Sequence, residues 1–276
     1  MSNSFSKTRQ PPYRSTVDAG LFTAILALTF SSTGAAAADL AIKAPEPPAY
    51  QWSGCYVGLN AGGGASGANF ASSVDSGTHL TGGDPALVGA DGSGSANVSS
   101  FLGGGQAGCN WQSRTLVFGL EGDFDYFHSN PLFSNNTDTL SDGVTPFTVT
   151  QSLTTDFLAT VRPRIGIAAD RNFAYVTAGA AFTRASYTQS YTDGATPAGT
   201  GLATGSRFLA GWTAGAGWEY AWTDHWTFRA EYLYASFPAA TNALGTITDA
   251  GGGTNTLHGS ANLVVQLARL GVNFKF

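Results

Sequence analysis

The chain has 276 residues, of which 43% are hydrophobic and only 11% are charged, and its net charge is −5. This negative balance argues against a nucleic acid as a partner, because proteins that bind the phosphate backbone carry a surplus of Lys and Arg. Glycine is abundant, with 36 residues, and aromatic residues make up 12% of the chain. Aromatic residues favour strands, so the composition indicates a β protein.

Residues 1–38 have the pattern of a secretory signal peptide. Basic residues such as Lys7 and Arg14 precede an apolar run at 19–30, and small residues follow up to Ala38. That order is typical of export signals. A membrane anchor is the alternative, but about twelve apolar residues are fewer than the roughly 18 to 20 that span a bilayer as a helix. We therefore expect cleavage after Ala38.

The segment at 39–51 contains the sequence Ala-Pro-Glu-Pro-Pro-Ala at 44–49, which is typical of an extended chain. We expect a proline-rich periplasmic leader there and a single domain at 52–276. No apolar run beyond residue 38 reaches the length of a transmembrane helix. A membrane domain would therefore have to cross with strands.

Apolar and polar residues alternate in eight segments, as they do in half-buried strands. These segments lie at 52–63, 99–112, 115–128, 152–168, 173–187, 206–221, 226–237 and 260–276. Short turns alternate with long polar connections, such as those at 72–98 and 129–150. Outer-membrane barrels have this rhythm, because every second connection is a tight periplasmic turn. The sequence predicts an all-β fold, an eight-stranded antiparallel transmembrane up-and-down β-barrel.

A soluble β-sandwich or lipocalin-like barrel would also have eight strands, and the position of the bulky side chains separates the two possibilities. In the third segment Phe118 and Phe124 share one face, while Glu121 and Asp123 share the other. Large aromatic side chains would overfill the interior of an eight-stranded barrel. We therefore expect the aromatic face to contact outer-membrane lipid and the polar face to line the interior.

Charged residues gather on the interior face of the predicted strands. The set is Glu121, Asp123, Asp125, Asp156, Glu219 and Glu231 with Arg162, Arg164, Arg207, Arg229, Arg269 and Lys275. An Arg or Lys that faced lipid at the bilayer midplane would cost about 2 to 4 kcal/mol. That all these charged residues fall on one face of the strands therefore supports assigning this face to the interior. The near balance of charge favours a salt-bridged plug, and a charged ion path is the alternative.

Two cysteines, Cys55 and Cys109, lie near the same end of the two strands of the first predicted hairpin, on the lipid-facing side. An exported protein folds in an oxidising compartment, where opposed residues on neighbouring strands can form a disulfide. A register offset of two residues would instead leave two free thiols. From these residues alone the disulfide and the two free thiols are both compatible with the sequence.

Histidines offer little evidence for a metal or cofactor site. His79, His128 and His258 fall on the side of the long loops, but with His225 they lack the spacing of metal ligands. We expect no metal and no cofactor, and capture of haem or metal by the loops is the alternative. No catalytic triad or carboxylate pair can be placed together from the sequence, so we expect no enzyme.

Several strand motifs resemble a known family. They read Trp-Ser-Gly-Cys-Tyr-Val-Gly at 52–58, Gly-Gly-Gln-Ala-Gly-Cys-Asn-Trp-Gln at 104–112, Val-Phe-Gly-Leu-Glu-Gly-Asp-Phe at 117–124, Arg-Ala-Glu-Tyr-Leu-Tyr at 229–234 and Gly-Val-Asn-Phe-Lys-Phe at 271–276. In these segments the chain resembles the small porin-like outer-membrane β-barrel family of alphaproteobacteria, which includes surface immunogenic proteins. The resemblance covers the strands and not the loops.

The resemblance implies a structural, surface-exposed protein of the Gram-negative outer membrane that contributes to envelope integrity. A small passive porin and a loop-mediated binder of haem or a host surface are the alternatives. It also implies that Phe276 is the assembly signal read by the barrel-insertion machinery, and that the termini are periplasmic and the long loops extracellular. Family members usually carry other residues where Cys55 and Cys109 stand, which favours a disulfide here. The oligomeric state is not implied.

Overall fold

The computed structural model describes residues 50–135 and 137–276. The predicted signal peptide and residues 39–49 of the predicted leader lie outside this part. The eight long strands are β1 (Gly54–Val74), β2 (Gly94–Ser113), β3 (Leu116–Ser129), β6 (Pro146–Ala169), β7 (Asn172–Asp193), β8 (Gly199–Ala221), β9 (Trp226–Asp249) and β10 (Thr254–Lys275). Helix α1 (Asp84–Asp91) follows β1, and the short strands β4 (Leu132–Ser134) and β5 (Asp138–Thr139) follow β3. No helix among the described residues is long and apolar enough to cross a membrane.

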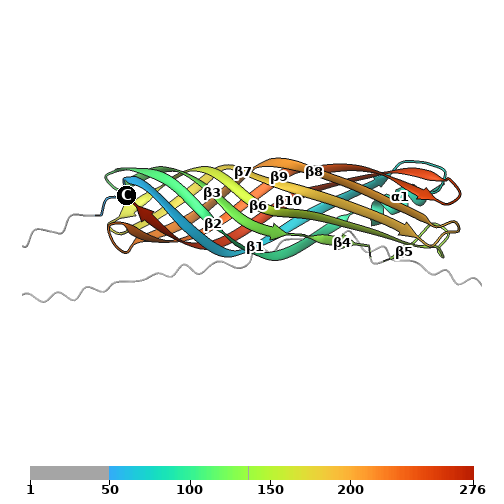
Figure 1. The fold of residues 1–276 in the computed structure, drawn as a ribbon, viewed down its shortest axis with the longest axis horizontal. Helices are drawn as coiled ribbons and strands as arrows, with labels where there is room; N and C mark the ends of the chain where they lie inside the picture. The colour runs from blue at the N-terminus through green and yellow to red at the C-terminus, as the bar shows by residue number, and fades with distance from the viewer. Residues whose placement is uncertain (1–49, 136) are drawn as a thin grey trace, which may run out of the picture. The chain divides into compact units, whose positions relative to one another are not determined.

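The long strands form a closed antiparallel ring. Their order is β3-β2-β1-β10-β9-β8-β7-β6, and β6 pairs back onto β3, so that no long strand is left as a free edge. Figure 1 shows the C-terminus at one end of this barrel and α1 at the other. The turns at 114–115, 170–171 and 222–225 lie at the C-terminal end, here called the short-turn end. The opposite end is called the long-loop end. The predicted fold class is confirmed.

The observed strands are longer than the strands predicted from the alternation of apolar and polar residues. β6 and β9 have 24 residues each, whereas a strand needs only about 9 to 11 to cross a bilayer. The predicted loops at 72–98 and 129–150 were therefore wrong in part, because β2 already begins at Gly94 and β6 at Pro146. The outward residues of these extensions are mostly Ser, Thr and Asn, which are also typical of loops.

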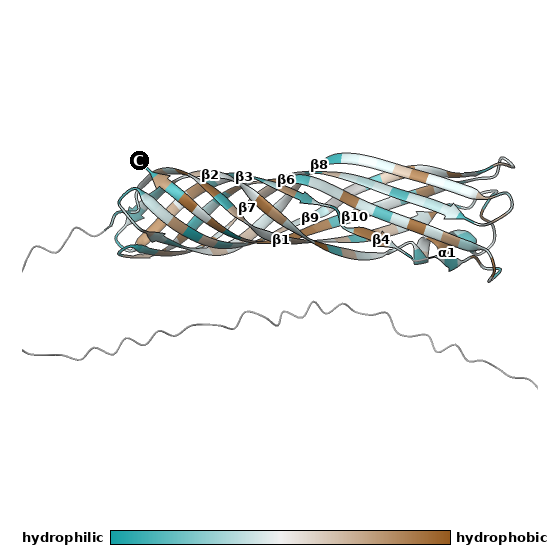
Figure 2. Ribbon diagram, turned by 60° about the horizontal axis from the view of Figure 1, so that its bottom comes forward, coloured by the Kyte–Doolittle hydropathy of each residue, from teal (hydrophilic) through white to brown (hydrophobic). Residues whose placement is uncertain are grey.

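The polarity of the wall reverses along the barrel. Near the short-turn end β6 buries Arg162 and exposes Ile165, whereas near the long-loop end it buries Val149 and turns Thr150 outward. A shift in pairing with β7 between Thr155 and Ala159 changes which alternate residues face inward. Figure 2 shows hydrophobic and hydrophilic residues alternating along the strands.

Large exposed side chains on the short-turn half form what is here called the apolar band. At the short-turn end it includes Trp111 and Trp222, and its far edge runs through Phe101, Tyr126 and Phe208. Beyond that edge most outward residues are polar, for example Ser99, His128 and Ser206, although Leu202 and Leu244 are also exposed there. An apolar exterior of this kind is suited to lipid, with aromatic residues at both interfaces. The long-loop half instead has the apolar interior and polar exterior of a water-soluble barrel.

This reversal predicts opposite sensitivities for two neighbouring residues. Val149 is fully buried, so Val149→Asn would bury an amide and lower the free energy of unfolding by about 1 to 3 kcal/mol. Thr150 is on the outward face, and Thr150→Asn should change it by less than about 0.5 kcal/mol. Urea unfolding of the barrel refolded in micelles measures both. Equal effects would contradict an apolar core in the long-loop half.

Candidate functional site: a charge cluster across the barrel interior

Nine charged side chains meet inside the short-turn half of the barrel and are here called the charge cluster. They are Glu121, Asp123, Asp125, Glu219 and Glu231 with Arg162, Arg164, Arg229 and Arg269, and none is more than 7% exposed. They come from β3, β6, β8, β9 and β10. Each alternates along its strand with outward residues, so the two-residue period of the strand brings it inside.

Ion pairs of the cluster join walls that face each other across the ring. Strands β3 and β9 are four places apart in the eight-stranded order, and Arg229 of β9 binds Glu121 of β3. Nη2 of Arg162, on β6, lies 2.8 Å from Oε1 of Glu121 and 3.3 Å from Oε2 of Glu231 on β9. One guanidinium therefore connects three strands across the lumen.

A second set of pairs fills the space around this centre. Nη2 of Arg269 lies 3.0 Å from Oδ2 of Asp123 and 2.7 Å from Oε2 of Glu231. Nη1 of Arg164 lies 2.6 Å from Oε1 of Glu219. Because buried charges are costly unless they are paired, the arginines and carboxylates stabilise one another in this position.

Two tyrosines that the sequence analysis did not single out complete the cluster. Tyr56 donates a hydrogen bond to Glu121, and Tyr175 donates one to Glu231 at 2.9 Å. The guanidinium of Arg164 lies 4.8 Å from the ring centroid of Tyr56, within the range of a cation–π interaction. At Gly217 a Cβ atom would lie 2.4 Å from the Tyr175 hydroxyl, so the glycine makes room for the ring.

The predicted interior set needs correction at three residues. Asp156 lies beside the shift in pairing, and its side chain is 69% exposed and bonded to His128. Arg207 is also exposed, in a stretch where the pairing of β8 with β9 is interrupted between 203 and 212. Lys275 lies at the short-turn end, with Nζ 4.2 Å from the ring centroid of Tyr50. The remaining nine predicted residues lie together.

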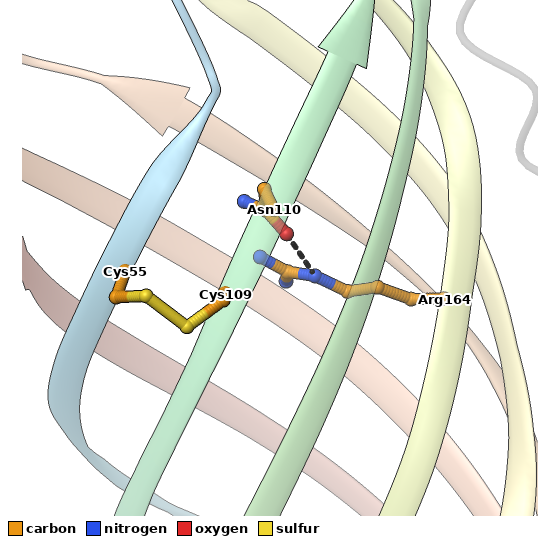
Figure 3. The surroundings of a disulfide bond; sticks show 4 residues. All are labelled: Cys55, Cys109, Asn110 and Arg164. Carbon is orange, nitrogen blue, oxygen red and sulfur yellow. Dashed lines mark hydrogen bonds between the residues drawn. A yellow bond between two sulfur atoms is a disulfide. The ribbon is translucent and has the colours of Figure 1, made fainter.

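The two cysteines are directly opposed in the β1–β2 pair. Their Cα atoms are 4.0 Å apart, and a disulfide joins Cys55 and Cys109. The bond lies on the outward face of the wall, where both residues line a shallow hollow with Trp111. The adjoining Asn110 points inward and accepts a hydrogen bond from Nε of Arg164 at 3.0 Å (Figure 3). The disulfide thus ties the two strands beside the charge cluster.

Both ends of the interior are covered. At the long-loop end Val88 of α1 and the preceding Leu80 are buried in the apolar core. At the short-turn end Trp52 is 1% exposed, lies 5.1 Å from Phe173 between ring centroids, and donates a hydrogen bond from Nε1 to the carbonyl of Asp170. Residues 50–53, directly before β1, therefore fold over this mouth of the barrel.

A buried histidine holds the long-loop end together. Nε2 of His79 lies 2.7 Å from Oδ2 of Asp193 at the end of β7, and Nδ1 lies 2.7 Å from Oδ2 of Asp249 at the end of β9. His128 and His258 pair separately with Asp156 and Asp75. Among the described residues no three His, Cys, Asp or Glu side chains are placed to hold a metal ion.

The surroundings of His79 favour its charged form. Burial opposes protonation, but the hydrogen bonds to Asp193 and Asp249 outweigh it, so the pKa of His79 lies above its usual value. Burial tends to raise the pKa of Asp193, yet the backbone N–H of Gly199 and the His79 ring lower it overall. The backbone N–H of Gly253 and the His79 ring likewise lower the pKa of Asp249, with burial a weaker opposing effect.

The sequence model of the outer membrane protein beta-barrel domain family matches residues 23–276 of this chain. The chain belongs to this family. A 31 kDa outer-membrane immunogenic protein of Brucella melitensis is 31% identical over 255 residues, which cover 89% of this chain and 95% of the relative. A 25 kDa outer-membrane immunogenic protein of Brucella canis is 27% identical and covers 90% of this chain and 93% of the relative.

Among solved structures, the outer membrane protein OprG from Pseudomonas aeruginosa is similar over 82% of this chain and 99% of that chain, with 8% identity and a TM-score of 0.38. Membership of the outer-membrane barrel family places the protein in the outer membrane of a Gram-negative bacterium. The short-turn end is therefore periplasmic and the long-loop end extracellular, with the apolar band in the lipid.

The His79 contacts predict a pH-dependent contribution to stability. Because the folded pKa of His79 is raised, its ion pairs are fully present below about pH 6.5, its unfolded pKa, and are lost as the pH rises through the folded pKa. Both aspartates stay ionised at pH 5, because their pKa values are lowered. Urea unfolding of wild type and His79→Gln from pH 5 to 9 measures this contribution. A wild-type advantage that does not shrink with rising pH would contradict it.

Proposed function

We propose that this outer-membrane barrel is a closed structural protein that contributes to envelope integrity and does not conduct. The observation that carries the proposal is that ion pairs connect opposite walls of the lumen. Arg162, whose side chain is fully buried, contacts both Glu121 on β3 and Glu231 on β9. A pore needs a continuous wet path, whereas an eight-stranded barrel has an interior that side chains can fill.

The extracellular half supports the same function with different chemistry. Its interior is lined by buried apolar side chains such as Leu153, Phe237 and Ile247, and α1 covers its outer end. An ion that entered this section would lose its hydration and find only a few neutral polar groups, such as Gln151 and Gln189, which is strongly unfavourable. A solute would therefore meet an apolar seal before it reached the charge cluster.

We also propose that the protein is not an enzyme. The carboxylates of the charge cluster are each bound to arginines and are out of contact with solvent. Their arrangement is suited to holding strands together, because a general acid or base must reach a substrate proton. The relatives named immunogenic outer-membrane proteins support a surface-exposed role.

The ends of the chain have a proposed part in assembly. Phe276 is 68% exposed at the periplasmic end, and its backbone N–H donates to the carbonyl of Cys55. We propose that the barrel-insertion machinery reads this exposed aromatic ring, as the family resemblance implies. Tyr50 and Trp52 lie at the same end and would close the periplasmic mouth after insertion.

Single-channel recording of the full chain, refolded into planar bilayers, tests the closed barrel. We expect no steady conductance, because both halves of the interior are filled. Glu231→Ala, inside the cluster, is compared with Asp142→Ala on the exposed connection at 130–145. A steady wild-type current that only Glu231→Ala alters would contradict the proposal and support a small passive porin.

A further inference from the structure

The charge cluster contains one more carboxylate than it has arginines. Five carboxylates face four guanidinium groups, and none of these nine side chains is more than 7% exposed. Lys275, a further cation on β10, lies at the periplasmic mouth, where its ammonium group lies over the ring of Tyr50. A negative charge that is held away from water without compensation is strongly unfavourable. We therefore expect the cluster to hold one additional positive charge.

Asp125 has the weakest compensation among the carboxylates of the cluster. Within the described residues its one ion pair joins Oδ2 to Nη1 of Arg269. The same guanidinium also binds Asp123, the neighbouring acid on β3, and Glu231 on β9. Arg229 of β9 acts on Asp125 only from beyond ion-pair distance. Because one guanidinium serves three carboxylates, the surplus negative charge falls on this end of the cluster.

Asp125 also lies where the charge cluster meets the apolar core of the extracellular half. It is fully buried and is paired across the strands with Leu158 of β6. The next inward residue of β3 is Phe127, and Leu267 lies two residues from Arg269 on β10. Leu158, Phe127 and Leu267 all belong to the apolar core. Apolar surroundings favour a neutral carboxylic acid over an ionised carboxylate.

Two oxygens without hydrogen-bond partners belong to side chains at this position. Asp125 pairs with Gly104 of β2, and Gly104 pairs with Asn60 of β1. A Cβ atom at Gly104 would collide with Oδ1 of Asp125, so the carboxyl group occupies the space over the glycine, within hydrogen-bonding reach of Asn60. Nδ2 of Asn60 donates to Gln106 at 2.8 Å. Among the described residues Oδ1 of Asn60 and Oδ1 of Asp125 have no partner, and one proton between two buried acceptors satisfies both.

We propose that Asp125 is a proton-binding site inside the barrel, whose Oδ1 carries a proton at neutral pH and donates it to Oδ1 of Asn60. Oδ2 of the neutral acid still accepts a hydrogen bond from Arg269. The proton is taken from solvent as the barrel folds, and it makes the charge cluster neutral. The inference goes beyond the structural role and does not depend on whether the lumen conducts.

Infrared spectroscopy of the full chain, refolded at neutral pH in an ester-free detergent, detects this proton directly. The C=O stretch of a carboxylic acid is separate from the bands of carboxylates and amides, and it moves when the protein is refolded in D2O. Asp125→Asn replaces the acid by a neutral amide of the same size, and Asn60→Leu removes the acceptor of the proton. Asp156→Asn, which changes the exposed carboxylate of β6, is the matched control.

We expect an isotope-sensitive acid band in wild type and in Asp156→Asn, and the loss of this band in Asp125→Asn. Asn60→Leu should keep the band at a shifted frequency, because the O–H group of Asp125 loses its acceptor. Absence of the band from wild type would overturn the proposal, since Asp125 would then be ionised and compensated by another cation or by the Asn60 amide. A band that survives in Asp125→Asn, or that Asn60→Leu leaves in place, would overturn it as well.

Discussion

A charge removed from water must be paired, and the periplasmic half of this barrel depends on that constraint. The strands must turn their aromatic faces to lipid, so their polar residues have no place except the interior. There Arg229 meets Glu121 from the opposite wall, Arg162 meets it from the adjacent strand β6, and Glu231 binds Arg162 and Arg269. Loss of any one partner would leave the other charged and buried, which makes the pairs mutually dependent.

The extracellular half is surrounded by water, so its strands can place polar residues outside and apolar residues inside. Once the strands leave the lipid, outward residues can be Ser and Thr, and the interior can be apolar. The shift in pairing between Thr155 and Ala159 brings β6 from one arrangement to the other. The same strands thus have the exterior of a membrane barrel in the periplasmic half and that of a water-exposed barrel in the extracellular half. At the extracellular end His79 joins β7 and β9 through Asp193 and Asp249.

The alternation of apolar and polar residues, together with the alternation of short and long connections, was sufficient to predict the closed eight-stranded barrel. It also predicted that most of the charged residues lie inside the barrel. The strand extensions were missed because Thr148 and Thr150 read as loop residues, although Val149 and Leu153 already alternated with them. Asp156 and Arg207 were misplaced because a one-residue shift and an interrupted strand pair depend on packing between strands, which local alternation does not record. Tyr56 and Tyr175 gave no signal of their own, since buried tyrosines are ordinary core residues.

A double-mutant cycle on Glu121 and Arg229 tests most directly whether ion pairs across the lumen hold the barrel together. The free energy of unfolding in lipid vesicles is measured for wild type, Glu121→Gln, Arg229→Met and the double variant. Each single change should cost about 3 to 5 kcal/mol, because it removes a partner from a buried charge and unbalances the cluster. We predict a coupling of about 1.5 kcal/mol or more between the two sites. Additive effects, within about 0.5 kcal/mol, would show that these opposite walls are not held by their charges.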